Sequence, residues 1–147
     1  VIGGSGPEER NLRKIAINLG ISDHLEFINW IERKELLDLF KKSDAFLFPS
    51  HEGAGMVVAE ALSFGLPVIC LNNDGPGGYV TEQSGMRVNV ESYAKTTDQI
   101  GSAIDDLFRD EALYKHLSKG ARERFMSMFH WDVRGNQLKN VYEDIAI

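Results

Sequence analysis

The sequence has very little cysteine, no long apolar run and no excess of basic residues. Cys70 is the single cysteine, so no disulfide can form within the chain, and its place after the apolar residues 67–69 predicts a reduced core thiol. No run of eighteen apolar residues occurs, so we expect no transmembrane helix and a cytoplasmic location. The formal net charge of −6 argues against general binding of nucleic acid or of an anionic membrane surface. We expect at most a peripheral membrane association of the full-length protein.

The remaining composition is that of an ordinary globular domain. Hydrophobic residues make up 43% and charged residues 26% of the 147 positions, so we expect one compact domain over residues 1–147. Apolar runs alternate with helical spacing, which predicts an α/β fold with a Rossmann-like parallel sheet flanked by helices. Strands are expected at the N-terminus and at 25–30, 45–48, 67–71 and 85–90, and helices at 7–19, 34–42, 56–64 and from 93 onward. An apolar stripe predicted to face the core contains Ile100, Ala103, Ile104, Leu107 and Phe108.

The stretch from Pro49 to Pro67 contains the most informative pattern. After a predicted strand, it passes through a loop that includes Gly53 and Gly55 and continues as a helix. A helix that opens behind a glycine loop presents free N–H groups and a partial positive charge, which suits a phosphate. Glu52 lies in the loop and Glu60 lies on the predicted helix. The pattern therefore predicts an anion site with a carboxylate toward each end of the ligand.

The ordered motifs of this stretch resemble the donor-binding C-terminal lobe of the retaining GT-B glycosyltransferases, the group 1 or glycogen-synthase-like family. The motifs are E-G-x-G at residues 52–55, E-A at 60–61 and G-x-P-V-I at 65–69. G-G-S-G-P at residues 3–7 resembles the G-x-G-P loop of the family, although taken alone it indicates only a tight turn. Residues 129–132 resemble the aromatic W-D or W-E turn of the family, so the resemblance extends along essentially the whole chain.

The resemblance implies a nucleotide diphospho-sugar as the donor, with a UDP or GDP linkage favoured over ADP, and neither a metal nor a cofactor. It assigns Glu52, as the catalytic candidate, to hold the donor sugar beside the anomeric carbon, and Glu60 to accept both ribose hydroxyls. The further donor-binding residues that it implies are Gly4, Ser5, Gly6, Ile31, Gly53, Gly55, Met56 and Val57. Backbone N–H groups at the start of the helix would then stabilise the departing phosphate.

The chain also departs from the family pattern. Residues 72–78 are rich in turn formers and are predicted as a loop at the carboxyl end of a strand, but the usual glutamate of the family falls near Gly78. The arginine and lysine that neutralise the diphosphate in relatives would lie before Val1. We therefore expect a fragment of a two-lobed enzyme without its N-terminal acceptor lobe, and inactive alone. Since the absent strand would be central, we predict that the sheet is reordered or that another chain fills the gap by self-association.

The resulting hypothesis is a donor lobe for retaining sugar transfer to an acceptor hydroxyl, in polysaccharide or glycoconjugate synthesis. A nucleotide-sugar epimerase of the same architecture and a non-catalytic assembly or regulatory domain stay open as alternatives. A carboxylate pair acting as general acid and base, as in glycoside hydrolysis, is less favoured, because the glycine loop and helix start between the carboxylates suit a phosphate. His51 is either a base or a turn residue, and Trp30 either a core or lobe-contact residue or a platform for a nucleobase.

Overall fold

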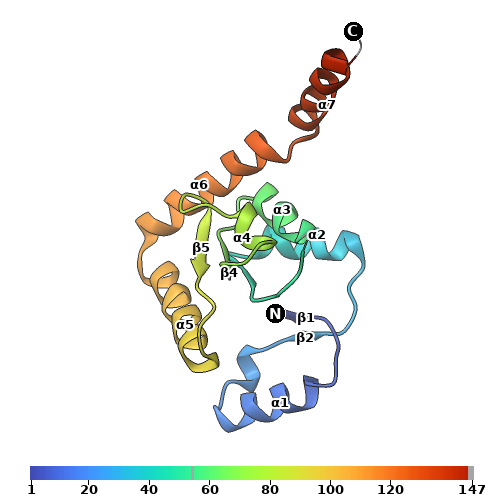
Figure 1. The fold of residues 1–147 in the computed structure, drawn as a ribbon. Helices are drawn as coiled ribbons and strands as arrows, with labels where there is room; N and C mark the ends of the chain where they lie inside the picture. Colours follow the sequence, from blue (N-terminus) through green and yellow to red (C-terminus); the bar gives the residue numbers. More distant parts are fainter. Residues whose placement is uncertain (54, 146–147) are drawn as a thin grey trace. The chain divides into compact units, whose positions relative to one another are not determined.

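The computed structural model describes residues 1–53 and 55–145 (Figure 1). The chain divides into two compact units, Val1–Leu39 and Phe40–Ile147, and each is described by itself. The first unit contains β1 (Ile2–Gly3), α1 (Glu9–Asn18), a 3-10 turn (Ser22–His24), β2 (Phe27–Ile28) and most of α2 (Arg33–Lys42). The second contains the end of α2, β3 (Phe46–Phe48), α3 (Met56–Ser63), β4 (Val68–Leu71), α4 (Pro76–Tyr79), β5 (Gly85–Val88), α5 (Tyr93–Arg109), α6 (Glu111–Met128) and α7 (Trp131–Ile145). Strands alternate with helices, which confirms the predicted α/β fold.

In the first unit, β1 and β2 are short parallel strands connected through α1. Ile2 pairs with Phe27, and the Gly4 N–H extends the ladder by donating to the Ile28 carbonyl at 2.9 Å. The Arg13 guanidinium of α1 lies 4.3 Å from the centre of the Phe27 ring, which attaches the helix to the sheet. Because parallel strands run in the same direction, the segments that follow β1 and β2 leave the same end of this sheet.

In the second unit, β3, β4 and β5 form a three-stranded parallel sheet with β4 at its centre. The register aligns Leu47 with Ile69 and Ile69 with Met86. All four residues of β4 are buried, as expected for a parallel strand that is covered on both faces. On β3, Phe46 and Phe48 stack with ring centres 5.5 Å apart, whereas alternation points Leu47 to the opposite face.

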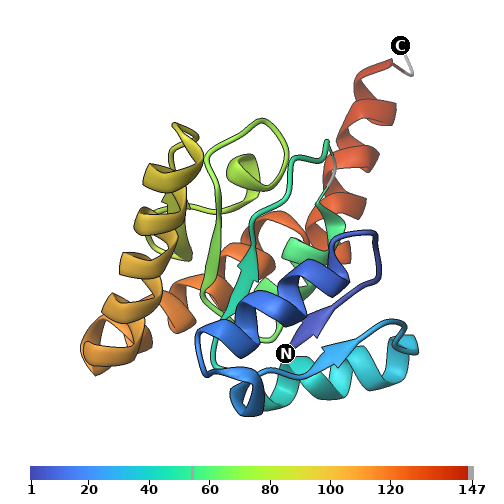
Figure 2. The ribbon, with the colours of Figure 1, turned by 90° about the horizontal axis from the view of Figure 1, so that it is seen from below.

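Helices cover both faces of this sheet. α3 packs against β3 and β4 and is itself covered by α6, whereas α5 lies against β4 and β5. Figure 2 shows α5 running beside the strands and α6 turning back from its end. One cluster of buried core residues consists of Ile69, Val88, Ala103, Leu107 and Leu117. α7 leaves the end of α6 and extends away from the sheet (Figure 1), and none of its described residues is buried.

Three sequence-based expectations are wrong in detail. Residues 72–78 are not entirely a loop, because Pro76, whose fixed φ suits the first position of a helix, begins the short helix α4. Trp30 is 82% exposed, which rules out the expectation of a core position. Ile104 and Phe108, predicted to face the core, are 45% and 88% exposed, so α5 is covered along only part of its apolar stripe.

The predicted interruption of the sheet is present in the described part of the chain. Residues 1–53 and 55–145 contain a two-stranded sheet, β1-β2, and a separate three-stranded sheet, β3-β4-β5. Among the strands of the described residues, β3 therefore pairs only with β4. That another chain fills the gap by self-association stays a prediction.

Candidate functional site

The predicted strand, glycine loop and helix are observed as β3, a connecting loop and α3. Gly55 is the N-cap of α3, with φ 55° and ψ 34°, a left-handed conformation that glycine adopts without steric cost. A Cβ at this position would also lie only 3.2 Å from Pro76 Cγ. Gly65, with φ 73°, follows the end of α3 and stops the helix as predicted. The local chemistry of the glycines thus determines where α3 begins and ends.

The Glu52 carboxylate folds back onto the start of α3. Its Oε1 accepts a hydrogen bond from the Gly55 N–H at 3.0 Å. A carboxylate near the positive end of a helix dipole gains about 0.3–1 kcal/mol at an exposed position, and Glu52 is exposed. The Glu52 carboxylate therefore provides the acceptor for the Gly55 N–H at the start of α3.

Further N–H groups are available at the first turn of α3. The Val58 N–H donates to the Gly55 carbonyl at 2.8 Å, whereas the N–H groups of Met56 and Val57 precede the first intrahelical hydrogen bond. Glu60 lies about 6 Å further along the axis, on the same face as Met56, because residues four apart share one side of a helix. Met56 is 61% exposed and Glu60 is half-buried.

The segment that follows β4 packs directly on this loop. Asn73 Nδ2 donates to the Ser50 carbonyl at 3.0 Å. Gly75 approaches Glu52 so closely that a Cβ there would lie 1.9 Å from the Glu52 carbonyl oxygen, which leaves room for glycine alone. The loops that follow β3 and β4 thus form one wall at the carboxyl end of the parallel strands, where ligands bind in open α/β sheets.

The remaining predicted site residues belong to the first unit. Gly4, Ser5 and Gly6 follow β1, Ile31 follows β2 by a short turn, and the parallel pairing places both segments at the same end of β1-β2. Gly4 has φ 126°, a conformation that favours glycine, and the three loop residues are exposed. The structure therefore brings these four together in one unit, and Glu52, Gly53, Gly55, Met56, Val57 and Glu60 together in the other.

Sequence reasoning missed three residues beside this site: Asn73, Gly75 and Arg124. The turn-forming composition of residues 72–78 indicated only that Asn73 and Gly75 lie in a loop, and it did not predict their contacts with Ser50 and Glu52. Arg124 donates to the carbonyls at the end of α4 from a helix far along the chain, which no local pattern signals. These contacts depend on how α6 crosses the unit, so only the tertiary structure reveals them.

Two other expectations concern groups near the site. Cys70 is a free, buried thiol as predicted, and burial raises its pKa to about 11 although the nearby Arg87 acts in the opposite direction. His51 is exposed in the loop after β3.

Across residues 1–53 and 55–145, no group of three histidine, cysteine, aspartate or glutamate side chains is arranged to hold a metal ion. No described helix is both long and apolar enough to cross a membrane.

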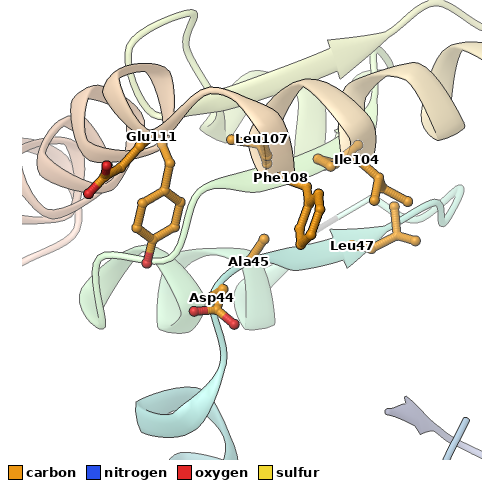
Figure 3. Close-up of a pocket in the computed structure, with 9 residues that line it drawn as sticks. Asp44, Ala45, Leu47, Ile104, Leu107, Phe108 and Glu111 are labelled. Carbon is orange, nitrogen blue, oxygen red and sulfur yellow. The ribbon is translucent and has the colours of Figure 1, made fainter. Parts of the chain in front are cut away.

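An apolar cavity of about 470 Å³ lies elsewhere in the second unit, between α5 and the open edge of the sheet (Figure 3). Leu47 of β3 and Ile69 of β4 line its floor, and Ile104 and Phe108 of α5 line its other side. None of the residues predicted to bind the donor contributes to it. The cavity is thus a separate feature, produced by the part of the α5 stripe that no described element covers.

Comparison with known proteins gives a family match. The family model for glycosyl transferases group 1 matches residues 1–124. The chain is 29% identical over 147 residues to the GDP-mannose-dependent alpha-(1-6)-phosphatidylinositol monomannoside mannosyltransferase of Mycobacterium tuberculosis, covering 94% of the chain and 37% of that protein. It is 26% identical to the GDP-mannose-dependent monoacylated alpha-(1-6)-phosphatidylinositol monomannoside mannosyltransferase of Corynebacterium glutamicum, covering 97% of the chain and 38% of that protein. The chain thus spans little more than a third of these relatives.

Solved structures give the same fold. Sucrose-phosphate synthase from Thermosynechococcus elongatus matches with a TM-score of 0.78 and 25% identity, over 98% of this chain and 37% of that one. The pneumococcal O-GlcNAc transferase GtfA, determined in complex with UDP and GlcNAc, matches with a TM-score of 0.80 and 22% identity, over 97% of this chain and 28% of that one. These matches confirm the predicted GT-B type of architecture.

Proposed function

Because the chain belongs to the group 1 glycosyl transferases, we propose that residues 1–147 form the donor-binding domain of a two-lobed enzyme. The proposed reaction moves a sugar from a nucleoside diphosphate to an acceptor hydroxyl with retention of configuration. The exposed start of α3, behind a glycine loop at the carboxyl end of parallel strands, carries this proposal. The GDP-mannose dependence named for the M. tuberculosis relative, and the UDP in the GtfA structure, support a donor of the GDP or UDP type.

In this proposal the start of α3 binds the diphosphate. The N–H groups of Met56 and Val57 point out of the first turn, and each hydrogen bond to a charged phosphate oxygen contributes roughly 1.5–3 kcal/mol. These bonds strengthen as negative charge develops on the leaving phosphate, which favours the transition state over the ground state. Gly53 lets the loop backbone approach the ligand closely, and Glu60 accepts the two ribose hydroxyls through its carboxylate oxygens.

Glu52 has a second role in the proposal, because its carboxylate and a donor phosphate compete for the Gly55 N–H. The phosphate displaces the carboxylate, which then turns to the hydroxyls of the donor sugar beside the anomeric carbon. Calorimetry on Glu52→Ala tests this exchange. We expect UDP or GDP to bind the variant as tightly as the parent or more tightly, and the matching nucleotide sugar to lose the extra affinity that its sugar supplies. Equal weakening for both ligands would contradict the exchange.

For the first unit, we propose donor contacts through the main chain of Gly4, Ser5, Gly6 and Ile31. Side-chain changes that preserve the backbone should then have little effect, so Ile31→Val is expected to keep the parent affinity. Gly4→Ala forces a side chain onto φ 126° and is expected to weaken nucleotide binding, because the loop must relax to a different conformation. The same affinity for Gly4→Ala and the parent would remove this loop from the proposed site.

The decisive experiment for nucleotide binding is a thermal-shift and calorimetry series with UDP, GDP, ADP and inorganic phosphate. A ligand at a hundred times its Kd adds roughly 2.7 kcal/mol, enough to raise the midpoint by several degrees. Glu60→Gln should lose most of this increase. Glu123→Gln is the matched control, since it removes one carboxylate from the exposed face of α6, where Glu123 lies 3.7 Å from Lys119. If no nucleotide stabilises the parent, or if both variants respond alike, the proposal fails.

We further propose that another part of a longer polypeptide completes the second unit. Two features support this: the unpaired edge of β3 in the described residues, and the apolar cavity beside it, where Phe108 is 88% exposed. Parallel strands are normally covered on both faces, and the unpaired N–H and C=O groups of an edge strand can pair with a further strand, so an added strand and helix would suit this edge. Light scattering, which measures the mass of the particle in solution, distinguishes completion by another part of the polypeptide from self-association of the chain. A monomer that binds a fluorescent apolar dye in the cavity supports the proposal, and a dimer that Phe108→Lys dissociates contradicts it.

A further inference from the structure

The C-terminal end of α4 is held by a side chain from a distant part of the sequence. Arg124 of α6 donates from Nε to the Tyr79 carbonyl at 3.0 Å and from Nη2 to the Gly78 carbonyl at 3.3 Å. These are the last carbonyls of a four-residue helix, so no N–H group within the helix donates to them, and a cation there also faces the negative end of the helix. The Tyr79 ring packs on Phe129 with centres 4.9 Å apart. α6 therefore holds the end of α4 through two hydrogen bonds from Arg124, and Phe129, directly after α6, adds an aromatic contact.

The opposite end of α4 lies against the loop that carries Glu52. Gly75, directly before α4, comes so close to the Glu52 carbonyl that a Cβ would lie 1.9 Å from it, and Pro76 lies against Gly55. The Tyr79 hydroxyl is 4.0 Å from the Met56 sulfur of α3. Since α4 is only about 6 Å long, a displacement of its C-terminal end is passed directly to the Glu52 loop and to the start of α3.

We propose that Arg124 is a positioning residue of the site: by capping α4 it holds the Glu52 loop and the start of α3 in the geometry that binds a nucleoside diphosphate. The donor part of this inference rests on the proposed function, whereas the mechanical part does not. Arg124 has no role in contact with the ligand. Its guanidinium acts through α4, because its two donors match two adjacent carbonyls in a way that one ammonium group does not.

The first measurement tests the mechanical part without any ligand. Backbone amide NMR spectra are recorded for Arg124→Ala, Arg124→Lys and the matched control Arg122→Ala. Arg122 is on the same helix and donates to the Ser63 carbonyl at the other end of α3. We expect the Gly55 and Gly75 amide signals to shift in Arg124→Ala, to shift less in Arg124→Lys, and to stay in place in Arg122→Ala. Unchanged Gly55 and Gly75 signals in folded Arg124→Ala would overturn the proposal.

The second measurement tests the consequence for binding, with GDP or UDP as the probe at a temperature where every variant is folded. We expect about tenfold weaker binding for Arg124→Ala, an intermediate value for Arg124→Lys and the parent affinity for Arg122→Ala. A merely stabilising role would lower the midpoints of both alanine variants and leave their affinities equal, which would refute the positioning role. If the parent binds neither nucleotide, the proposed function fails, and the amide signals alone decide whether Arg124 positions the loop. If Arg124→Ala does not fold, the folded Arg124→Lys variant decides both measurements, and parent-like signals and affinity in it overturn the proposal.

Discussion

The contact between Gly75 and Glu52 gives a prediction that can be worked out from the structure. A Cβ added at Gly75 would lie 1.9 Å from the Glu52 carbonyl oxygen, whereas real Cβ atoms essentially never lie closer than 3.0 Å to such a neighbour. One of the two segments must therefore move by about 1 Å. Gly78, three residues further, meets nothing within 4 Å and serves as the matched control. Gly75→Ala should therefore displace the Glu52 loop, whereas Gly78→Ala should leave it in place.

The magnitude follows from what lies on each side of the contact. Forcing an atom into a packed position costs typically 1–3 kcal/mol, and the low end is expected here because the Glu52 loop is exposed and can give way. The expected loss of binding free energy is larger than the loss of stability, because the displaced loop leads directly into Gly55, the N-cap of α3. Losing one charge-assisted hydrogen bond of roughly 1.5–3 kcal/mol corresponds to a ten- to hundredfold weaker Kd.

Urea denaturation followed by circular dichroism and nucleotide titration by calorimetry measure the two effects. Gly75→Ala should unfold at lower urea and bind the nucleotide at least tenfold more weakly, whereas Gly78→Ala should stay within about 0.5 kcal/mol of the parent and keep its affinity. If Gly75→Ala equals Gly78→Ala in both stability and Kd, the close approach at Gly75 does not shape the site and the reasoning is refuted.

Three further predictions concern the framework. Gly120→Ala should destabilise the fold by about 1–2 kcal/mol despite the higher helix propensity of alanine, because its Cβ would lie 1.7 Å from the Gln83 carbonyl oxygen. The control Gly101→Ala, whose Cβ would meet nothing within 4 Å, should be neutral or stabilising by up to about 1 kcal/mol. Urea denaturation curves in which both substitutions stabilise the fold would contradict this prediction. Burial favours the neutral Cys70 thiol and raises its pKa to about 11, so the contribution of this thiol to the free energy of unfolding is full below about pH 9 and is lost as the pH rises toward 11. The native thiol should resist alkylation at pH 8, and Cys70→Ala should reduce the decline of stability between pH 9 and 11. Trp30 and Trp131 are 82% and 86% exposed, so native tryptophan emission should resemble that of the unfolded chain and be quenched readily by acrylamide, and a blue-shifted native emission would show that something covers one of them.

Much of the local structure around the site could be predicted from the sequence, because it depends on residues close together in the chain. Gly55 and Gly65 set the ends of α3 through their backbone freedom, and the apolar run at Val68–Leu71 could only be a buried strand. Glu52 and Glu60 were predicted on either side of the helix start from their spacing alone. The ordered motifs were also sufficient to predict the family that the comparison with known proteins gives.

The contacts that fix the geometry depend on the tertiary structure. The spacing of the motif did not predict that the Glu52 carboxylate accepts a hydrogen bond from the Gly55 N–H, because that contact depends on how the loop folds back onto the start of α3. The exposure of Trp30 and Phe108 could not be predicted from the sequence, since the spacing of apolar residues along a helix or strand is the same whether or not another element covers them.

The α/β alternation and the glycine loop with its two carboxylates could be inferred from the amino-acid sequence, because each of these follows from the conformational preferences of neighbouring residues. Two features became known only from the packing of the chain: α4 is a short helix between the Glu52 loop and Arg124, and β3 pairs with no described strand other than β4, next to an apolar cavity. Those features arise where segments distant in the chain meet, and packing selects such contacts through shape and hydrogen-bond geometry that no local pattern encodes.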